Sequence, residues 1–112
     1  MAYSTVAEVK AVLDIVEDDY NTEITECVVS ADALIDGLCK AQGLSVPTPV
    51  PQLVKDGSKQ FAAWVFKKQW GDPEAAEHFY EAGLRFVQAH IDGALNTPAE
   101  EGEADFRVVS DQ

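Results

Sequence analysis

Leu44-Ser45-Val46-Pro47-Thr48-Pro49-Val50-Pro51 separates two long amphipathic stretches of this 112-residue chain. Three prolines at alternate positions exclude a helix here, because proline lacks an N–H and its ring clashes with the preceding turn. The residue before each proline is also pushed towards extended geometry. The sequence therefore predicts one helix over 24–42, a second over 53–70, and a short, stiff, extended link between them.

The stretch 24–42 has the clearest helical periodicity in the chain. Its apolar residues recur at steps of three and four and predict one continuous stripe: Ile24, Cys27, Val28, Ala31, Leu34, Ile35 and Leu38. The other face is predicted to be acidic, with Glu23, Glu26, Asp32 and Asp36. Gly43 is well placed to end the helix in left-handed geometry. A calcium loop is a weaker interpretation, because these aspartates fall on the helix and not in a Gly-turned loop.

A short helix is predicted before this pair. Thr5-Val6-Ala7-Glu8 matches a capping box, which satisfies N–H groups at a helix start. The helix should run over about 6–14 and end at the acidic run Glu17-Asp18-Asp19. Asn21 or Thr22 can then cap the next helix.

A fourth helix is predicted after residue 70. Gly71 suits the end of the helix over 53–70, Asp72 suits an N-cap, and Pro73 suits a first turn. The fourth helix should continue to about residue 95, and Gly83 within it indicates a close contact with another helix. Such a short junction favours antiparallel neighbours.

The predicted fold class is therefore all-α, a compact bundle of about four helices with a proline-rich extended link. Residues 1–97 should form the helical domain, and 98–112 an extended acidic C-terminal tail typical of a mobile linker. This tail ends in Phe106, Arg107, Val108 and Val109, a short apolar run that could add to a partner's sheet edge or dock in a groove. A frayed tail is the alternative.

Charge and composition limit the function classes. Twenty acidic residues against eight basic ones give a net charge of −12, which disfavours tight binding to nucleic-acid phosphates. The excess suits a high-salt cytoplasm, where acidic self-repulsion is screened, and an ordinary acidic mesophilic protein equally well. Residues 1–5 lack a secretory signal, and no stretch approaches the ~18 apolar residues of a membrane span, so we expect synthesis in the cytosol.

Few residues are candidates for chemistry. Cys27 and Cys39 lie about 18 Å apart along one predicted helix, so buried reduced thiols are expected in place of a disulfide. His78 with Glu74 and Glu81 has permissive metal-ligand spacing, but no fourth ligand is evident. No catalytic motif is present, so we predict a protein that is not an enzyme and uses no cofactor.

The helix over 53–70 is locally basic, because Lys55, Lys59, Lys67 and Lys68 oppose only Asp56. Aromatic residues interleaved with lysines can indicate nucleic-acid binding, although core rings and a solvated face are the commoner explanation. A further interpretation is that the lysines face an acidic neighbour of the same fold. Lys67 and Lys68 are therefore predicted to lie at a partner interface, together with the residues of the run 106–109.

With these features in place, the chain resembles the small helical head–tail connector (adaptor) proteins of long-tailed viruses, most closely the Mu-like and lambdoid members. The resemblance covers about residues 3–93 and rests on these segments: Tyr3-Ser4-Thr5-Val6-Ala7-Glu8-Val9, Ala33-Leu34-Ile35-Asp36-Gly37-Leu38, the three spaced prolines, Phe61-Ala62-Ala63-Trp64, Tyr80-Glu81-Ala82-Gly83-Leu84 and Ile91-Asp92-Gly93. The chain departs from the family at Cys39-Lys40, where a basic or aromatic pair is common, and in its acidic surface and tail. Those departures fit a virus of a halophilic host, for example an archaeal one.

The resemblance implies a structural virion protein at the head–tail junction. Such a protein forms a homo-oligomeric ring, commonly of twelve copies, between the portal protein and a stopper or tail-completion protein. DNA passes through the channel without sequence-specific binding, and no membrane is involved. The alternative from the residues alone is an acidic helical binding module in the cytosol, one version being a DNA-mimicking regulator whose carboxylates imitate phosphates.

Overall fold

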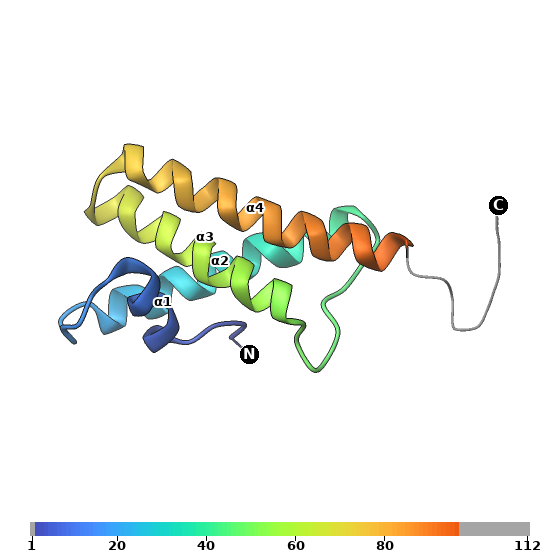
Figure 1. Cartoon of the computed structure of the whole chain (residues 1–112). Helices are drawn as coiled ribbons and strands as arrows, with labels where there is room; N and C mark the ends of the chain where they lie inside the picture. The colour runs from blue at the N-terminus through green and yellow to red at the C-terminus, as the bar shows by residue number, and fades with distance from the viewer. Residues whose placement is uncertain (1, 97–112) are drawn as a thin grey trace.

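The computed structural model describes residues 2–96, and these residues form four helices and no strand. The helices are α1 (Val6–Leu13), α2 (Asn21–Ala41), α3 (Gln52–Trp70) and α4 (Pro73–Asn96). The long helices α2, α3 and α4 pack as a bundle, and the short α1 lies against α2 and α3 (Figure 1). The predicted all-α class is confirmed.

The helices α3 and α4 form an antiparallel hairpin with a two-residue junction (Figure 1). Gly71 ends α3 by donating its N–H to the Lys67 carbonyl oxygen at 3.0 Å. Asp72 Oδ1 then accepts the N–H of Glu74 at 3.0 Å, so this aspartate caps α4 as predicted. The cap satisfies a donor that the first turn of a helix leaves without a partner.

Glycines allow α3 and α4 to approach closely. A Cβ atom at Gly83 would lie 2.7 Å from Phe61 Cδ1, and one at Gly57 would lie 2.7 Å from Val87 Cγ2. Both positions are buried within the hairpin. The predicted close contact at Gly83 is confirmed, and Phe61 of α3 is the side chain that occupies the space.

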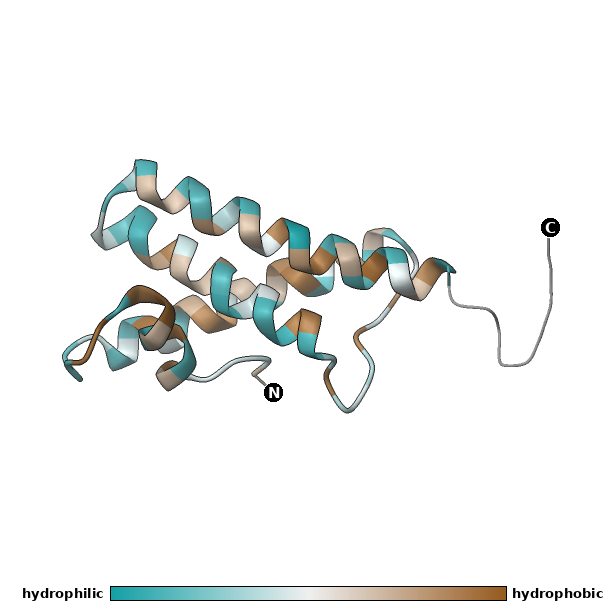
Figure 2. Cartoon of the chain, viewed as in Figure 1, coloured by the Kyte–Doolittle hydropathy of each residue, from teal (hydrophilic) through white to brown (hydrophobic). Residues whose placement is uncertain are grey.

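The core is formed where the apolar stripes of all four helices meet. Val9 of α1, Ile24 and Ile35 of α2, and Val54 and Phe61 of α3 are completely buried. Figure 2 shows apolar and polar segments alternating along α3 and α4, as amphipathic helices require. Cys27 and Cys39 are free thiols in this core, as predicted, and burial raises the pKa of Cys27 to about 11.

The first helix ends at Leu13, within one residue of the predicted end, and Asp14 after it adopts left-handed geometry with φ 60°. The second and third helices start earlier than predicted. The second starts at Asn21 with Tyr20 as N-cap, and no side chain caps it. The third starts at Gln52, directly after its N-cap Pro51.

The end of α2 follows the prediction. Gly43 has φ 74°, and its N–H reaches the Lys40 carbonyl oxygen at 2.9 Å while the N–H of Leu44 reaches that of Cys39 at 2.9 Å. These two bonds form the Schellman arrangement, which pairs carbonyl groups that a helix end would otherwise leave without donors.

The proline-rich link is outside the helices, but it is not a straight strut. The chain bends at Thr48 and Pro49, and the peptide bond between them is cis. The extended geometry predicted from the alternating prolines is therefore not confirmed. The predicted acidic tail, residues 98–112, lies outside the described residues.

Candidate functional site

The two predicted interface lysines occupy the last turn of α3. Lys67 and Lys68 lie near its C-terminal end, where the partial negative charge of the helix favours cations. The other predicted interface residues, Phe106, Arg107, Val108 and Val109, lie outside the described residues. The structure therefore places only the lysine half of the predicted interface.

Lys68 is held over an aromatic cluster between α3 and α4. Its Nζ atom lies 4.7 Å from the centroid of the Trp64 ring, within the range of a cation–π contact. The Trp64 ring lies 4.7 Å from that of Tyr80, and Phe61 contacts both rings. The ammonium group of the exposed Lys68 therefore lies over the face of the indole.

A second aromatic group lies on the other side of α3. Phe66 meets Tyr20 edge-on with ring centroids 5.5 Å apart, and Trp70 at 5.4 Å. Tyr20 is 42% exposed and Trp70 is 47% exposed. By helical position, Lys67 falls between this group and the Trp64–Lys68 pair. We call the set Tyr20, Trp64, Phe66, Lys67, Lys68 and Trp70 the aromatic–lysine end.

Within residues 2–96, the lysines of this end have no ion-pair partner. Ion pairs among residues 2–96 join Lys10 to Asp18 at 2.7 Å and Lys59 to Asp56 at 3.1 Å, and neither Lys67 nor Lys68 takes part in one. Within the same range, exposed carboxylates such as Glu26 of α2 also lack a cationic partner. One copy therefore offers surfaces of both signs.

The sequence interpretation of Asp32 was wrong. This residue is 8% exposed and lies under the N-terminal segment. Its Oδ2 atom accepts the N–H of Tyr3 at 2.9 Å, and its Oδ1 atom accepts the hydroxyl of Ser58 at 2.8 Å. The Ser58 hydroxyl has one proton, so Ser4 Oγ, 2.6 Å away, donates to Ser58 Oγ.

This buried network connects the N-terminal segment to α2 and α3. Burial raises the pKa of Asp32 above its ordinary value, while the hydrogen bonds from Tyr3 and Ser58 oppose the shift. No histidine belongs to the network, so it holds the fold together and does not form a nucleophile. A signal was present in the sequence, because Val28, Asp32 and Ile35 follow the same steps of four and three as the apolar stripe.

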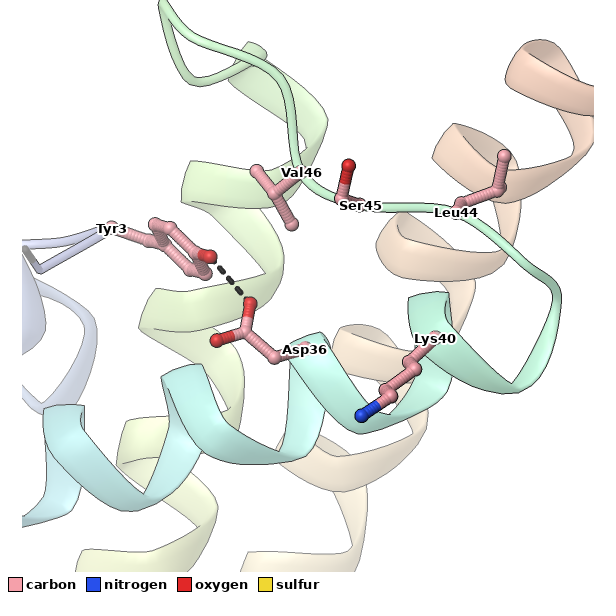
Figure 3. A pocket seen from close by; sticks show the side chains of 6 residues that line it. All are labelled: Tyr3, Asp36, Lys40, Leu44, Ser45 and Val46. Atoms are coloured by element: carbon pink, nitrogen blue, oxygen red, sulfur yellow. Dashed lines mark hydrogen bonds between the residues drawn. The ribbon is translucent and has the colours of Figure 1, made fainter.

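Asp36, one turn further along α2, is exposed and accepts a hydrogen bond from the Tyr3 hydroxyl (Figure 3). Burial and this carboxylate both raise the pKa of Tyr3, which therefore stays a neutral donor. The pair borders an open hollow of about 430 Å³ lined by Tyr3, Asp36, Lys40, Leu44, Ser45 and Val46 (Figure 3). The hollow contains no pair of groups arranged for acid–base or nucleophilic catalysis.

The described residues contain neither a metal-ligand cluster nor a membrane-spanning helix. No group of three or more His, Cys, Asp and Glu side chains in the range 2–96 could hold a metal ion, so the spacing of Glu74, His78 and Glu81 does not produce a site. His90 of α4 is half-buried. No helix of this range is long and apolar enough to cross a membrane.

Comparison with known proteins does not identify the chain. No protein-family model, no curated protein and no solved structure matches it. A functional proposal must therefore rest on the residues and their arrangement.

Proposed function

We propose that this protein is a structural virion component, a head–tail connector that assembles into a ring between the portal and a stopper or tail-completion protein. The observation that carries the proposal is the aromatic–lysine end, where Tyr20, Lys68 and Trp70 are exposed and neither lysine has an acidic partner among residues 2–96. The sequence resemblance supplies the biological setting.

The composition of this end suits a protein contact. Tryptophan and tyrosine are common at the centres of protein interfaces, and charged side chains such as the two lysines belong to the polar rim. Tyr20 and Trp70 each leave close to half of their surface in water, although both rings already pack on Phe66. A partner that covers them would remove further apolar surface from water at little cost in side-chain entropy.

A ring needs two different surfaces on each copy. Head-to-tail contacts between identical chains close into rings when the rotation between neighbours permits. The aromatic–lysine end and the carboxylates of α2, such as Glu26, are two such surfaces with opposite charge. We propose that the lysines of one copy meet the acidic face of α2 in the next.

The remaining parts of the proposal concern partners. The run 106–109 is the proposed contact with the portal, and an acidic channel lining would let DNA slide without sequence-specific binding. At −12 per copy, repulsion between neighbours has to be screened before short-range contacts can form. Assembly should therefore increase with salt.

A charge-reversal variant tests the proposed interface. We expect the natural chain to form a ring in high salt, and Lys67→Glu with Lys68→Glu should prevent it. Sedimentation velocity and native mass spectrometry measure the assembly of both chains. Lys55→Glu with Arg85→Glu is the matched control, because it changes the net charge equally and neither cation has an ion pair among residues 2–96. Both variants carry −16, which is −12 minus 4.

Two results would contradict the proposal. One is equal assembly of the two variants, which would remove the lysines from the interface. The other is a natural chain that stays monomeric at every salt concentration and is absent from virus particles, which would remove the connector function itself.

A further inference from the structure

A second face of α2 borders a groove that the bundle does not fill. Thr25, Val29, Ala33, Asp36 and Lys40 follow steps of three or four and line this face, away from the fully buried stripe. The N-terminal segment from Ala2 to Val6 forms the opposite wall. Three hollows of about 240, 320 and 430 Å³ lie along it. The first two share Ala2 and Val29, and the last two share Asp36, so the hollows lie next to one another along this face, with the Tyr3–Asp36 hydrogen bond at the junction of the last two. We call this row of hollows the groove.

The chemistry changes along this groove. One end is apolar, with Val6, Val28 and Val29, and Val29 is 65% exposed. The middle is acidic, because Asp36 lies there with its carboxylate at the surface. The other end combines the Tyr3 ring with Leu44 and Val46 (Figure 3). The groove therefore suits a short peptide with a cation between apolar side chains.

We propose that Phe106-Arg107-Val108-Val109 of the same chain docks in this groove. Among residues 97–112, the bulky apolar side chains are Phe106, Val108 and Val109, and Arg107 is the single base. In an extended segment Phe106 and Val108 project to one side and Arg107 to the other. The two apolar side chains can enter the groove, and the long Arg107 side chain can fold back over its rim to pair with the exposed Asp36 carboxylate. Asp36 has no cationic partner among residues 2–96.

The length of the chain permits docking within one copy. Residues 97–105 can span roughly 30 Å when extended, at about 3.3 Å per residue. The link residues Leu44–Val46, which line the near end of the groove, lie beside the C-terminal half of α4 (Figures 1 and 3). A tether of this length gives an effective concentration in the mM range, so a weak four-residue contact is sufficient.

This inference does not depend on the proposed ring. It concerns the free chain, and the groove does not include the aromatic–lysine end. A partner such as the portal would have to displace the run from the groove before using it.

Paramagnetic broadening of the full chain tests the proposal. A nitroxide is attached at Ser110→Cys, while Cys27 and Cys39 stay unlabelled because they are 2% and 0% exposed. In dilute solution the amide signals of Val29, Ala33 and Lys40 should lose intensity. Those of Glu77 and Glu81, on the exposed side of α4, should keep theirs.

A matched pair of variants makes the test specific. Ala33→Arg places a large cation on the floor of the groove and should abolish the broadening at Val29 and Lys40. Ala75→Arg is the same substitution at an exposed position of α4, and it should leave the broadening at Val29 and Lys40 unchanged. Arg107→Glu should weaken the broadening, and Arg107→Lys should retain most of it.

Three results would overturn the proposal. The first is broadening that is absent, or that is uniform over the whole chain. The second is broadening that persists in Ala33→Arg. The third comes from mixing spin-labelled chain with unlabelled ¹⁵N-chain. If the ¹⁵N-chain then shows the same selective losses, the groove receives the run of a second copy and not its own.

Discussion

Asp32 decides how the N-terminal segment is attached to the bundle. Its carboxylate accepts hydrogen bonds from the Tyr3 backbone at 2.9 Å and the Ser58 hydroxyl at 2.8 Å. Asparagine can replace it, because its oxygen can accept from Tyr3 while its amide donates to Ser58, which then donates to Ser4. Alanine cannot, and it leaves two buried donors without acceptors.

We therefore predict different stabilities for two substitutions of Asp32. Asp32→Ala should lower the free energy of unfolding by about 1–3 kcal/mol at neutral pH. Asp32→Asn should stay within about 1 kcal/mol of the natural chain, since it keeps the network and removes a buried charge. Urea unfolding followed by circular dichroism measures both. Equal losses would mean that the hydrogen bonds are not the reason for the burial of Asp32.

The same residue should make stability depend on pH. Because burial raises the pKa of Asp32 above 3.8, the folded chain holds this proton more tightly than the unfolded chain does. The contribution of Asp32 is therefore greatest below pH 3.8 and falls as pH rises through the folded-state pKa. The free energy of unfolding of the natural chain minus that of Asp32→Asn should decline over this range. If this difference in the free energy of unfolding increased with pH, it would contradict the raised pKa of Asp32.

Asp14 is a second residue with a measurable conformational cost. Its φ of 60° is left-handed, a region that residues with a Cβ atom enter at a penalty. Asp14→Gly should raise the free energy of unfolding by up to about 1 kcal/mol, because glycine adopts this geometry freely. Asp14→Ala removes the same charge but keeps the Cβ atom, so it should not stabilise the chain. Thermal unfolding of the two variants compares them directly.

At the scale of the elements, the α3–α4 hairpin depends on the close approach at Gly83. Gly83→Ala would place a Cβ atom 2.7 Å from Phe61 Cδ1. Such overpacking typically costs about 1–3 kcal/mol, which exceeds the gain of up to about 1 kcal/mol in helix propensity. We predict a net loss of stability, measured by urea unfolding.

Gly37 provides the control for this prediction. A Cβ atom there meets nothing within 4 Å, so Gly37→Ala in α2 should stabilise the chain through propensity alone. Phe61→Leu shortens the opposing side chain and makes room for the added Cβ atom. The double variant with Gly83→Ala should therefore lose less stability than the sum of the two single variants in a double-mutant cycle. If Gly83→Ala and Gly37→Ala changed the free energy of unfolding in the same direction, the contact of Gly83 with Phe61 would not limit the stability of the hairpin.

The helices could be predicted because their signals are local. The Thr5–Glu8 capping box, the left-handed Gly43 and the Asp72 cap each involve neighbours in sequence, and all three appear in the structure. The end of α1 was predicted to within one residue, although the left-handed geometry of Asp14 was not. The bend at Thr48–Pro49 was missed because alternating prolines restrict φ but leave the direction of the chain open.

The candidate sites were predicted less completely, because they combine distant segments. Lys67 and Lys68 were located from charge alone, and the Trp64–Lys68 contact follows from their spacing of four on one helix. The contact of Tyr20 with Phe66 spans 46 residues and has no local signal. The groove was missed for the same reason, since its second wall comes from the N-terminal segment.

At the scale of the whole molecule, the negative net charge affects the stability of each single copy, independently of contacts between copies. A net charge of −12 on 112 residues repels itself, and the exposed acids lie close together in the segment that precedes α2. Of these, Asp18 has a cationic partner in Lys10, which holds the pKa of this carboxyl below its usual value. Raising the salt from 0.1 to 1 M shortens the Debye length from about 10 to about 3 Å. Self-repulsion should fall accordingly.

We therefore predict that monovalent salt stabilises the free chain, and that removing exposed acids reduces this effect. Glu17→Gln, Asp19→Asn and Glu26→Gln together change the net charge from −12 to −9, since each removes one negative charge. None of the three acids has an ion pair among residues 2–96. The salt-induced gain in the free energy of unfolding should be smaller in the variant by roughly 1 kcal/mol, at about 0.3 kcal/mol per charge. Thermal unfolding of dilute protein in increasing NaCl measures both chains, and effects of salt on apolar hydration cancel in the difference. Equal salt dependence would show that repulsion among these carboxylates does not limit the stability of the fold, and that the salt requirement of the proposed ring would have to arise between copies alone.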